Sequence, residues 1–477
     1  MHVTAQLQEQ PNQDLCGLPS ALKEAQLNKA LHDLPSALKG AKLSEDGLPS
    51  MLKEVKLSEE VVAQFSRGSV DDALQAKLAQ AGAEDAFFVA DLGEVARQHA
   101  QWVRLLGRVQ PFYAVKCNPD ALVVRLLARL GAGFDCASRA ELALALGAGA
   151  AAADVIYAHP CKPASHLRYA AAQGVELLTF DNADELAKIS ALHPRARAVL
   201  RILADDSGAR CRLGLKFGAA PEATAALLRA AVALRVDVVG VSFHVGSGCE
   251  SDAAYADAVL RARRVFDQAA ALGLRLTLLD VGGGFPGRAD PSGLAFGAVA
   301  RVLAAALDRH FPRDAYAHVR VIAEPGRYFV ASAFTLAVNV IARRRVDAEA
   351  GPAFMYYVND GVYGSFNCIV FDHQRPRPRV LAIACSSSGI ADASYPSNTI
   401  ANASTDSAIS YPSSLWGPTC DSIDCIVRDG LLLPELRIGD WLAFENMGAY
   451  SNSAASRFNG FKLSDIIYVD SERALLW

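Results

Sequence analysis

Residues 110–120 read Gln-Pro-Phe-Tyr-Ala-Val-Lys-Cys-Asn-Pro-Asp, and this stretch decides how the rest of the chain is interpreted. A short apolar run rich in strand-forming residues opens after Pro111 and closes at the turn residues 118–120. Such a run is typical of a strand buried on both faces, which places Lys116 at the carboxyl end of a predicted parallel strand. Catalytic groups of α/β folds lie at that end of the strands.

Lys116 has two interpretations. Desolvation at the edge of an apolar pocket disfavours the charged form of a lysine, and an accessible neutral amine can form a Schiff base with an aldehyde cofactor. A strand-end lysine whose side chain reaches solvent is the simpler alternative, and this stretch alone favours it. Features elsewhere in the chain reverse that preference.

Strand and helix patterns alternate around this stretch. Helical spacing covers residues 92–106 and ends at Gly107, and a strand-like run precedes most of the later helices. Parallel strands joined by right-handed helical crossovers explain the alternation, and the count of strands is close to eight. We therefore expect an α/β fold with a TIM (β/α)8 barrel over residues 91–328. The further predicted strands are 133–137, 155–158, 177–181, 198–203, 238–244, 274–281 and 319–324.

Helical spacing largely disappears after Tyr328. Short strand-like runs separated by turn residues predict a C-terminal antiparallel β domain over residues 329–477, with a Ser-rich surface insertion at 386–410. Residues 61–90 are expected to form a lead-in strand and helix that join this β domain. The runs in the β domain are 334–341, 354–358, 379–385, 441–444 and 466–469.

The first sixty residues differ from the remainder. The sequence Leu-Pro-Ser-Ala-Leu-Lys occurs at 18–23 and 34–39, and returns at 48–53 with Met51 in place of alanine. Each copy resembles one helix start, but the copies are too short to build a solenoid. We expect residues 1–60 to be a flexible leader that contains these repeats.

Composition excludes several classes of protein. Hydrophobic residues make up 52% of the chain, which supports a large core, and the formal net charge of −4 argues against nucleic-acid binding and against a polybasic membrane surface. No apolar run is long enough to span a bilayer, and the polar residues 1–14 do not resemble a signal peptide. Scattered cysteines without paired spacing indicate reduced thiols, so a cytoplasmic location is expected.

Glycines and polar residues follow the later predicted strands. Gly282, Gly283 and Gly284 come directly after strand 274–281, where glycine lets backbone N–H groups approach a phosphate. A glycine run on its own is more often a simple turn. The run therefore becomes informative only together with its neighbours.

The ends of two other predicted strands carry ionisable groups. Glu324 could face a cationic ring nitrogen and Arg327 could bind a phosphate, although an ion pair between the two explains them equally well in isolation. His244 could stack on a ring and Ser247 could bind a phosphate. A strand-end histidine alone is more often a polar core residue whose hydrogen bonds are satisfied.

Taken together, these residues predict a site for pyridoxal 5′-phosphate. One lysine forms the Schiff base, one acid keeps the pyridine nitrogen protonated, one imidazole covers the ring, and a Gly/Ser/Arg shell binds the phosphate. A metal-dependent barrel enzyme fits less well, because His, Asp and Glu do not fall at ligand spacing on these strand ends. We therefore expect no metal.

The chain resembles the alanine-racemase-like (fold-type III) family of decarboxylases that use pyridoxal phosphate, and within it the eukaryotic ornithine decarboxylases. The resemblance covers residues 85–477, apart from the insertion. His159 stands where the family usually has asparagine, and Phe371 stands where animal members usually have tyrosine. The matching motifs are 111–118, 159–162, 243–248, 280–287, 324–328, 357–367, 416–421 and 445–450.

The resemblance implies a role for each matching residue. Lys116 would be the Schiff-base lysine, His244 the stacking residue and Cys420 the general acid that returns a proton to the α carbon. From the residues alone, Cys420 would count as an inert thiol and Asp421 as a helix cap. The implied cofactor-binding residues are Lys116, Asp135, Arg201, His244, Ser247, Gly283, Gly284, Glu324, Gly326, Arg327 and Tyr450, and the implied substrate-binding residues are Phe371, Asp372 and Asp421.

The resemblance also implies an activity and an assembly. The expected reaction is decarboxylation of L-ornithine to putrescine, the first step of polyamine biosynthesis, in a homodimer whose active sites are shared across the interface. An antizyme is an additional candidate partner. Two alternatives remain: a related decarboxylase acting on lysine, arginine or diaminopimelate, and a non-catalytic regulator resembling antizyme inhibitor. The pair Cys420-Asp421 argues against the diaminopimelate branch, and the intact Lys116, Glu324 and Tyr450 argue against the regulator.

Overall fold

The computed structural model describes residues 65–66, 68–80, 82–287, 293–348, 351–381 and 410–472. The chain divides into two compact units, Met1–Lys56 and Leu57–Trp477. The predicted leader 1–60 lies outside the described residues, as does the predicted insertion 386–410 except for its last residue. All structural statements below therefore concern the second unit.

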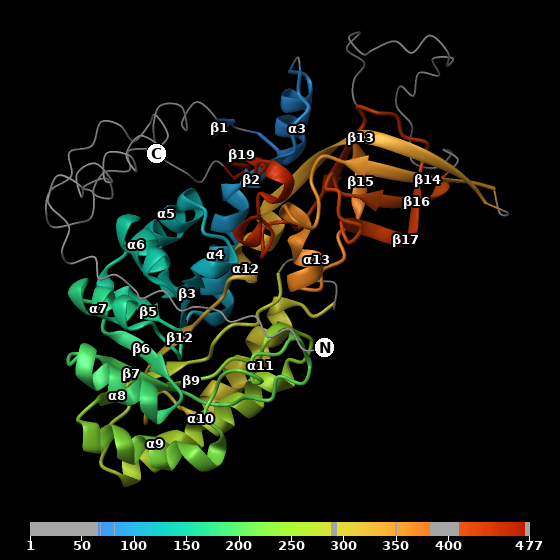
Figure 1. Cartoon of the computed structure of the whole chain (residues 1–477). Coiled ribbons are helices and arrows are strands. Elements are labelled where there is room, and N and C mark those ends of the chain that lie inside the picture. Colours follow the sequence, from blue (N-terminus) through green and yellow to red (C-terminus); the bar gives the residue numbers. More distant parts are fainter. Residues whose placement is uncertain are drawn as a thin grey trace, which may run out of the picture. The chain divides into compact units, whose positions relative to one another are not determined.

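Eight parallel strands close into a barrel, which confirms the predicted TIM-barrel class (Figure 1). Their order around the barrel is β11-β12-β3-β4-β5-β6-β7-β9. The strands are β3 Val109–Ala114, β4 Gly133–Cys136, β5 Val155–Tyr157, β6 Leu177–Phe180, β7 Arg197–Arg201, β9 Asp237–Ser242, β11 Leu278–Asp280 and β12 Arg320–Ala323. The main helices are α4 Leu92–Leu106, α5 Ala121–Arg129, α6 Arg139–Gly147, α7 Ala164–Ala172, α8 Ala183–Leu192, α9 Pro221–Leu234, α10 Ala253–Ala271 and α11 Phe296–His310.

The stretch 110–120 contains both the strand and the start of the following helix. Its apolar run forms β3, and Lys116 lies in the single turn η4, Val115–Cys117, at the carboxyl end of that strand. The Asp120 carboxylate then accepts hydrogen bonds at 3.0 Å from the backbone N–H groups of Leu122 and Val123, which caps α5. Local sequence signals therefore fix the position of Lys116 along the chain.

Apolar side chains from the barrel strands meet in one buried cluster. Its members come from seven of the eight barrel strands or their immediate ends, so they fill the barrel interior. A larger cluster packs the outer faces of the strands against the helices. Because the interior is filled, any site must lie at a mouth of the barrel rather than inside it. The interior cluster comprises Phe112, Ile156, Ala158, Leu177, Val199, Val239, Leu278 and Ile322.

The second sheet has nine strands and confirms a separate β region. Its main path is β1-β19-β2-β13-β14-β16-β17, while β18 pairs with both β13 and β15. Most pairs are antiparallel, but β1–β19, β19–β2 and β14–β16 are parallel, so the sheet is mixed rather than purely antiparallel. The strands are β1 Phe65–Ser66, β2 Phe87–Asp91, β13 Phe334–Ala348, β14 Gly351–Val358, β15 Pro378–Leu381, β16 Tyr411–Trp416, β17 Cys425–Leu433, β18 Trp441–Phe444 and β19 Asp465–Val469.

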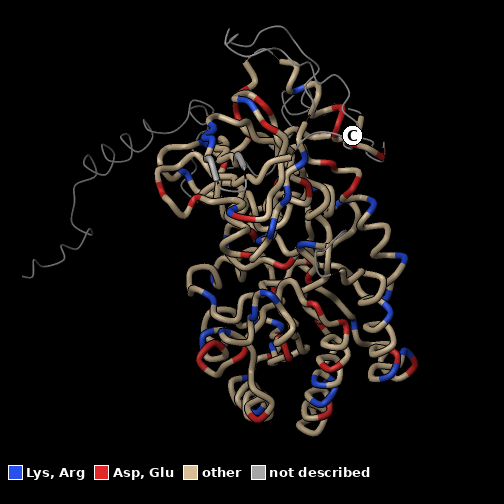
Figure 2. Tube along the Cα trace, turned by 90° about the vertical axis from the view of Figure 1, so that its right-hand side faces the viewer, with Lys and Arg blue, Asp and Glu red and all other residues tan. Residues whose placement is uncertain are grey.

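Backbone hydrogen bonds join the barrel to the second sheet region near Lys116. The backbone N–H of Tyr450 donates to the Cys117 carbonyl at 3.0 Å, and the N–H of Gly448 donates to that of Ala331 at 3.2 Å. Figure 2 shows basic and acidic residues interspersed along the trace. Among the helices described, none is both long enough and apolar enough to cross a membrane.

Candidate active site

A small cavity at the carboxyl end of the barrel strands collects most of the predicted site residues. Side chains reach it from β3, β9, β11 and β12 or from the turns that follow them, and Tyr450 enters from the second sheet region. The structure therefore brings together residues that are far apart in the sequence. The cavity is lined by Ala114, Lys116, His244, Ser247, Gly284, Phe285, Glu324, Gly326, Arg327 and Tyr450.

Lys116 is held by carboxylates. Its amine forms a short ion pair with Asp135, which is completely buried on β4. Burial alone lowers the pKa of Lys116, but the carboxylates of Asp135 and Glu324 outweigh burial and raise this pKa above its ordinary value. Desolvation of Lys116 therefore acts in the expected direction, but the two acids, whose proximity the sequence did not show, reverse the net shift of this pKa.

His244 is a neutral imidazole. Its Nδ1 atom accepts a hydrogen bond at 2.9 Å from the backbone N–H of Gly246, which places the ring proton on Nε2. Burial, together with the positive charges of Arg201 and Lys116, holds the pKa of His244 well below its usual range. A neutral, oriented ring at this place suits contact with the face of a planar ligand.

Two buried acids, Asp280 and Glu324, lie at neighbouring strand ends, and Glu324 lines the cavity. Burial, together with the charges of Asp280 and Asp135, raises the pKa of Glu324 well above its usual range. Burial also raises the pKa of Asp280 to about 7. Asp280 opens the matching motif 280–287 but carried no individual predicted role. The pair of acids would be stabilised as anions by a cation in the cavity.

Arg327 and Ser247 form an anion-binding corner. The Arg327 Nη2 atom donates to Ser247 Oγ at 2.9 Å, and its guanidinium lies 5.2 Å from the centre of the Tyr450 ring. Tyr450 has a left-handed backbone, with φ of 55°, and this turn directs its side chain into the cavity. Hydroxyl and guanidinium groups in this arrangement suit a phosphate.

Three glycines allow the loops around the cavity to pack closely together. A Cβ atom at Gly283 would lie 2.7 Å from His244 Nε2, and one at Gly284 would lie 2.6 Å from the Gly246 carbonyl oxygen. Gly284 also has φ of 92°, which a side chain would strain. Gly326 packs on Cys117, where an added Cβ would approach to 2.8 Å. Only glycine permits this close approach of three loops.

Arg201 lies outside the lining of the cavity. It ends β7, and its guanidinium lies 5.5 Å from the centre of the Phe217 ring. Its charge nevertheless lowers the pKa values of both His244 and Glu324, so it acts on the site electrostatically.

The predicted substrate residues and Cys420 are not gathered in this cavity. Asp372 is buried and accepts hydrogen bonds from Arg327 Nη2 and from Gln374 Nε2, both at 2.6 Å. Phe371 remains 66% exposed. Cys420 is exposed, and Asp421 accepts a 2.5 Å hydrogen bond from the Tyr363 hydroxyl. One chain alone therefore leaves Cys420 and Asp421 outside the lining of its own cavity.

The residues of the cavity fit pyridoxal 5′-phosphate. The Oδ1 atom of Asp135, the partner of Lys116, is buried and has no hydrogen-bond partner among the described residues, so one acceptor beside Lys116 is unused. The Lys116 amine suits an aldehyde, and the acids with raised pKa values suit a protonated pyridine. The neutral His244 imidazole suits a planar ring. The glycines and the Arg327/Ser247 corner suit a phosphate. Within the described part of the chain, His, Cys, Asp and Glu side chains form no group able to bind a metal.

The raised pKa of Asp280 predicts a dependence of stability on pH. An acid whose pKa is about 7 when folded and 3.8 otherwise binds more protons in the folded state, so it stabilises the fold below pH 3.8 and loses this effect as the pH rises through 7. In cofactor-free protein, Asp280→Asn should therefore flatten the fall in melting temperature between pH 5 and about pH 7, above which the loss is nearly complete.

Thermal denaturation across this pH range provides the measurement. Asp308→Asn is the control, because Asp308 is an exposed carboxylate that pairs with Arg108 on the barrel surface. Equal pH dependence in wild type, in Asp280→Asn and in the control would show that Asp280 does not titrate as described.

Comparison with known proteins adds the following similarities. Residues 92–331 match the family model "pyridoxal-dependent decarboxylase, pyridoxal binding domain". The chain is 51% identical to ornithine decarboxylase of Schizosaccharomyces pombe over 388 residues, which cover 81% of this chain and 84% of that protein. It is 50% identical to antizyme inhibitor 2 of Xenopus laevis over 400 residues, or 82% of each chain. The solved structure of the Paramecium bursaria Chlorella virus arginine decarboxylase bound to agmatine aligns with a TM-score of 0.75 and 34% identity, over 83% of this chain and 100% of that chain.

Proposed function

This chain belongs to the family of pyridoxal-dependent decarboxylases, and from that premise we propose that it converts L-ornithine to putrescine and carbon dioxide. The observation that carries the proposal is the single cavity that joins Lys116, Glu324 and Arg327 at the barrel mouth. Putrescine formation is the first step of polyamine biosynthesis, and we place the enzyme in the cytoplasm. Release of carbon dioxide from ornithine, lysine and arginine, with and without added pyridoxal phosphate, tests the proposal.

The residues in and around the cavity would each contact a different group of the cofactor. Lys116 would bind the aldehyde carbon, and Glu324 would accept a hydrogen bond from the pyridine nitrogen. His244 would cover the ring. The phosphate would be held by Ser247, Arg327, Tyr450 and the loops at Gly283, Gly284 and Gly326. Asp135 and Arg201 would support the lysine and the ring through their charges. Bound there, the cofactor supplies an electron-withdrawing ring that takes up the electron pair left when carbon dioxide departs.

The protein residues control protons around this chemistry. Asp135 contacts the Lys116 amine and stabilises its protonated form. His244 stays neutral beside these cations, so it adds no charge that would oppose the protonated ring. The proton that replaces the carboxylate must reach the α carbon, and we assign this step to the thiol of Cys420.

Cys420 must therefore reach a cavity that it does not line in its own chain. We propose a two-fold homodimer in which Cys420 of the partner subunit completes the barrel site of the first chain. A two-fold axis makes the exchange reciprocal and gives two shared sites. The exposed positions of Cys420 and Phe371 in one chain support this proposal.

The substrate carries a second ammonium group, which needs acidic partners. Asp372 lies beside Arg327 at the edge of the cavity, and Asp421 of the partner subunit would approach with Cys420. Phe371 directly precedes Asp372 and would present an apolar ring beside the chain of the substrate. Two carboxylates at a fixed distance from the reactive carbon favour one chain length of diamino acid.

We therefore predict a preference for ornithine over lysine, because a longer chain places its ammonium away from the carboxylates and leaves charge unpaired. Asp421→Ala should lower kcat/KM for ornithine by about 100-fold, which corresponds to losing one buried charge pair. Asp429→Ala removes an exposed carboxylate from the neighbouring strand β17 and provides the control. Equal kcat/KM for lysine and ornithine would refute the assignment.

A regulator that resembles antizyme inhibitor is the second candidate, favoured by the 50% identity to antizyme inhibitor 2. The convergence of Lys116, Glu324 and Tyr450 in one cavity supports the enzyme instead. We also propose an antizyme as a protein partner, to be tested by binding assays. Pure protein that binds antizyme but releases no carbon dioxide from any of the three amino acids would favour the regulator.

A further inference from the structure

Asn118 lies directly after the turn that carries Lys116, and it has no part in the chemistry described above. Its side chain is almost completely buried, and its own carbonyl accepts a hydrogen bond at 2.8 Å from the Tyr113 hydroxyl. The Oδ1 atom accepts another at 3.1 Å from the N–H of Asp120, which leaves Nδ2 as the donor on the other side of the amide. Nδ2 donates to the carbonyl of Gly448 at 3.0 Å.

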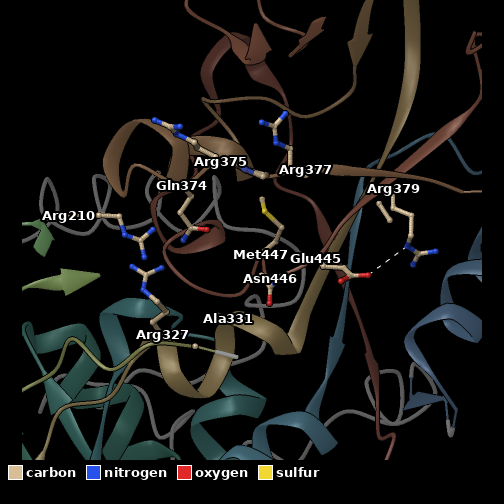
Figure 3. Close-up of a pocket in the computed structure, with 13 residues that line it drawn as sticks. Arg210, Arg327, Ala331, Gln374, Arg375, Arg377, Arg379, Glu445, Asn446 and Met447 are labelled. Atoms are coloured by element: carbon tan, nitrogen blue, oxygen red, sulfur yellow. Dashed lines mark ion pairs between the residues drawn. The ribbon is translucent and has the colours of Figure 1, made fainter. Parts of the chain in front are cut away.

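Gly448 belongs to residues 446–450, which we call the tyrosine turn. Both of its ends have left-handed backbones, with φ of 59° at Asn446 and 55° at Tyr450. A residue other than glycine keeps this conformation only where surrounding contacts hold it. Figure 3 shows Asn446 and Met447 near Ala331, with which they line a second cavity. The position of Tyr450 therefore depends on what holds the tyrosine turn.

One set of contacts holds the tyrosine turn without involving the segment of Lys116. An added Cβ at Gly448 would lie only 1.8 Å from the Val330 carbonyl oxygen, so the packing there is close. The hydrogen bonds of this set run from the Gly448 N–H to the Ala331 carbonyl (3.2 Å), from the Met447 N–H to the Phe334 carbonyl (2.9 Å), from Gln374 Nε2 to the Ala449 carbonyl (3.3 Å) and from the Ser451 hydroxyl to the Met447 carbonyl.

The segment of Lys116 holds the tyrosine turn at two further points. The Cys117 carbonyl accepts a hydrogen bond at 3.0 Å from the N–H of Tyr450, and the Asn118 amide donates to Gly448. The two bonds lie on either side of Ala449. Because the other contacts keep the turn folded, loss of the Asn118 amide should change where Tyr450 lies relative to Lys116 rather than unfold the turn.

The separation of Tyr450 and Lys116 matters because the two residues serve opposite ends of one ligand. Tyr450 lines the cavity, and its ring centre lies 5.2 Å from the Arg327 guanidinium, in the corner assigned to the phosphate. Lys116 lies at the end assigned to the aldehyde. A ligand that is held at both ends binds tightly only if supporting hydrogen bonds fix the spacing of the groups that hold it.

We propose that Asn118 is a positioning residue, whose amide ties the tyrosine turn to the turn of Lys116 and thereby places the Tyr450 hydroxyl for the phosphate of the cofactor. This inference rests on the proposed function, in which Tyr450 contacts that phosphate. Asn118 touches neither the aldehyde end nor the groups assigned to the ring. Its loss should therefore weaken recognition of the phosphate and leave recognition of the pyridoxal ring unchanged.

Equilibrium dialysis of cofactor-free protein against pyridoxal 5′-phosphate, and separately against pyridoxal, measures the two parts of recognition. Asn118→Ala removes the amide without adding charge, and Asn118→Asp keeps the size of the side chain and the acceptor for the Asp120 N–H. Both variants should bind pyridoxal phosphate about tenfold more weakly, the scale of one lost hydrogen bond, and bind pyridoxal as wild type does. Melting temperatures without cofactor verify that the variants fold.

Asn339→Ala is the matched control. Asn339 is also buried, and its Nδ2 atom donates to a glycine carbonyl, that of Gly439, at 3.1 Å on β13. The control should lose a similar hydrogen bond and keep the wild-type affinities for both ligands. Adding Asn118→Ala to Tyr450→Phe should weaken binding of pyridoxal phosphate by less than about twofold further, because the hydroxyl that Asn118 places is already absent.

Equal weakening of pyridoxal and pyridoxal phosphate in the Asn118 variants would overturn the inference, as would the same loss in Asn339→Ala. Independent losses from Asn118→Ala and Tyr450→Phe would show that Asn118 does not act through Tyr450. A loss confined to Asn118→Asp would be an effect of charge and would also overturn it. Wild type that binds no pyridoxal phosphate would overturn the proposed function as well, whereas unaltered binding in the variants beside normal decarboxylation by wild type would overturn this inference alone.

Discussion

Lys116→Ala should lose essentially all decarboxylation, with kcat reduced by about a thousandfold or more, the scale on which covalent catalysis fails when its nucleophile is removed. The amine is the cavity's only lysine among the residues that line it, and it contacts the buried Asp135. Alanine cannot bond to an aldehyde, and no other amine stands in its place. Carbon dioxide release from ornithine measures the loss.

Absorbance gives a second measurement that does not depend on turnover. Wild type mixed with pyridoxal phosphate should show the visible band of a lysine-bound cofactor, which borohydride reduction fixes covalently to Lys116. Lys116→Ala should show neither the band nor the covalent label. Lys188→Ala provides the control, because it removes a partly exposed barrel lysine from an ion pair with Glu185. Turnover in Lys116→Ala close to that of wild type would refute the assignment.

Mixing two inactive variants should restore activity to about a quarter of that of wild type. Lys116→Ala and Cys420→Ala should each be nearly inactive alone. In a mixed dimer with two-fold symmetry, one shared site carries both defects and the other carries neither. Random pairing makes about half of the dimers mixed, and each mixed dimer has one intact site of two.

The measurement requires proof that subunits exchanged. Native mass spectrometry of differently tagged chains after co-refolding supplies that proof, and each variant refolded alone at the same total concentration is the control. If exchange is verified and no activity returns, Cys420 either serves the barrel of its own chain or is not the proton donor. The shared-site proposal would then be abandoned.

Much of the fold could be predicted from the sequence because its signals are local. The apolar run before Lys116 and the helical spacing of α4, Leu92–Leu106, depend only on neighbouring residues. Strands β16 and β17 were not predicted, since Tyr411–Trp416 includes two serines and a proline and Cys425–Leu433 is partly exposed. The parallel pairing of β19 with β2 was also not foreseen, because pairing partners far apart in sequence leave no local signal.

The sequence predicted some features of the site but not others. Strand-end positions identified Lys116, Glu324 and the glycine run, and the structure gathers them around one cavity. The direction of the pKa shift at Lys116 could not be derived, because the shift depends on Asp135 and Glu324, which only the closed barrel brings close. No individual role was predicted for Asp280 for the same reason. Roles for Cys420 and Asp421 came from family resemblance alone and stay predictions.

The arrangement of β2 in the second sheet has a consequence for synthesis of the protein. Strand β2 pairs with β13 on one side and with β19 on the other, and all five of its residues are buried. The ribosome therefore releases β2 long before either pairing partner exists, with both hydrogen-bonding edges and its apolar side chains exposed. Co-translational folding of the barrel would then proceed beside an unpaired apolar strand, the kind of surface that chaperones protect from aggregation until its partners are made.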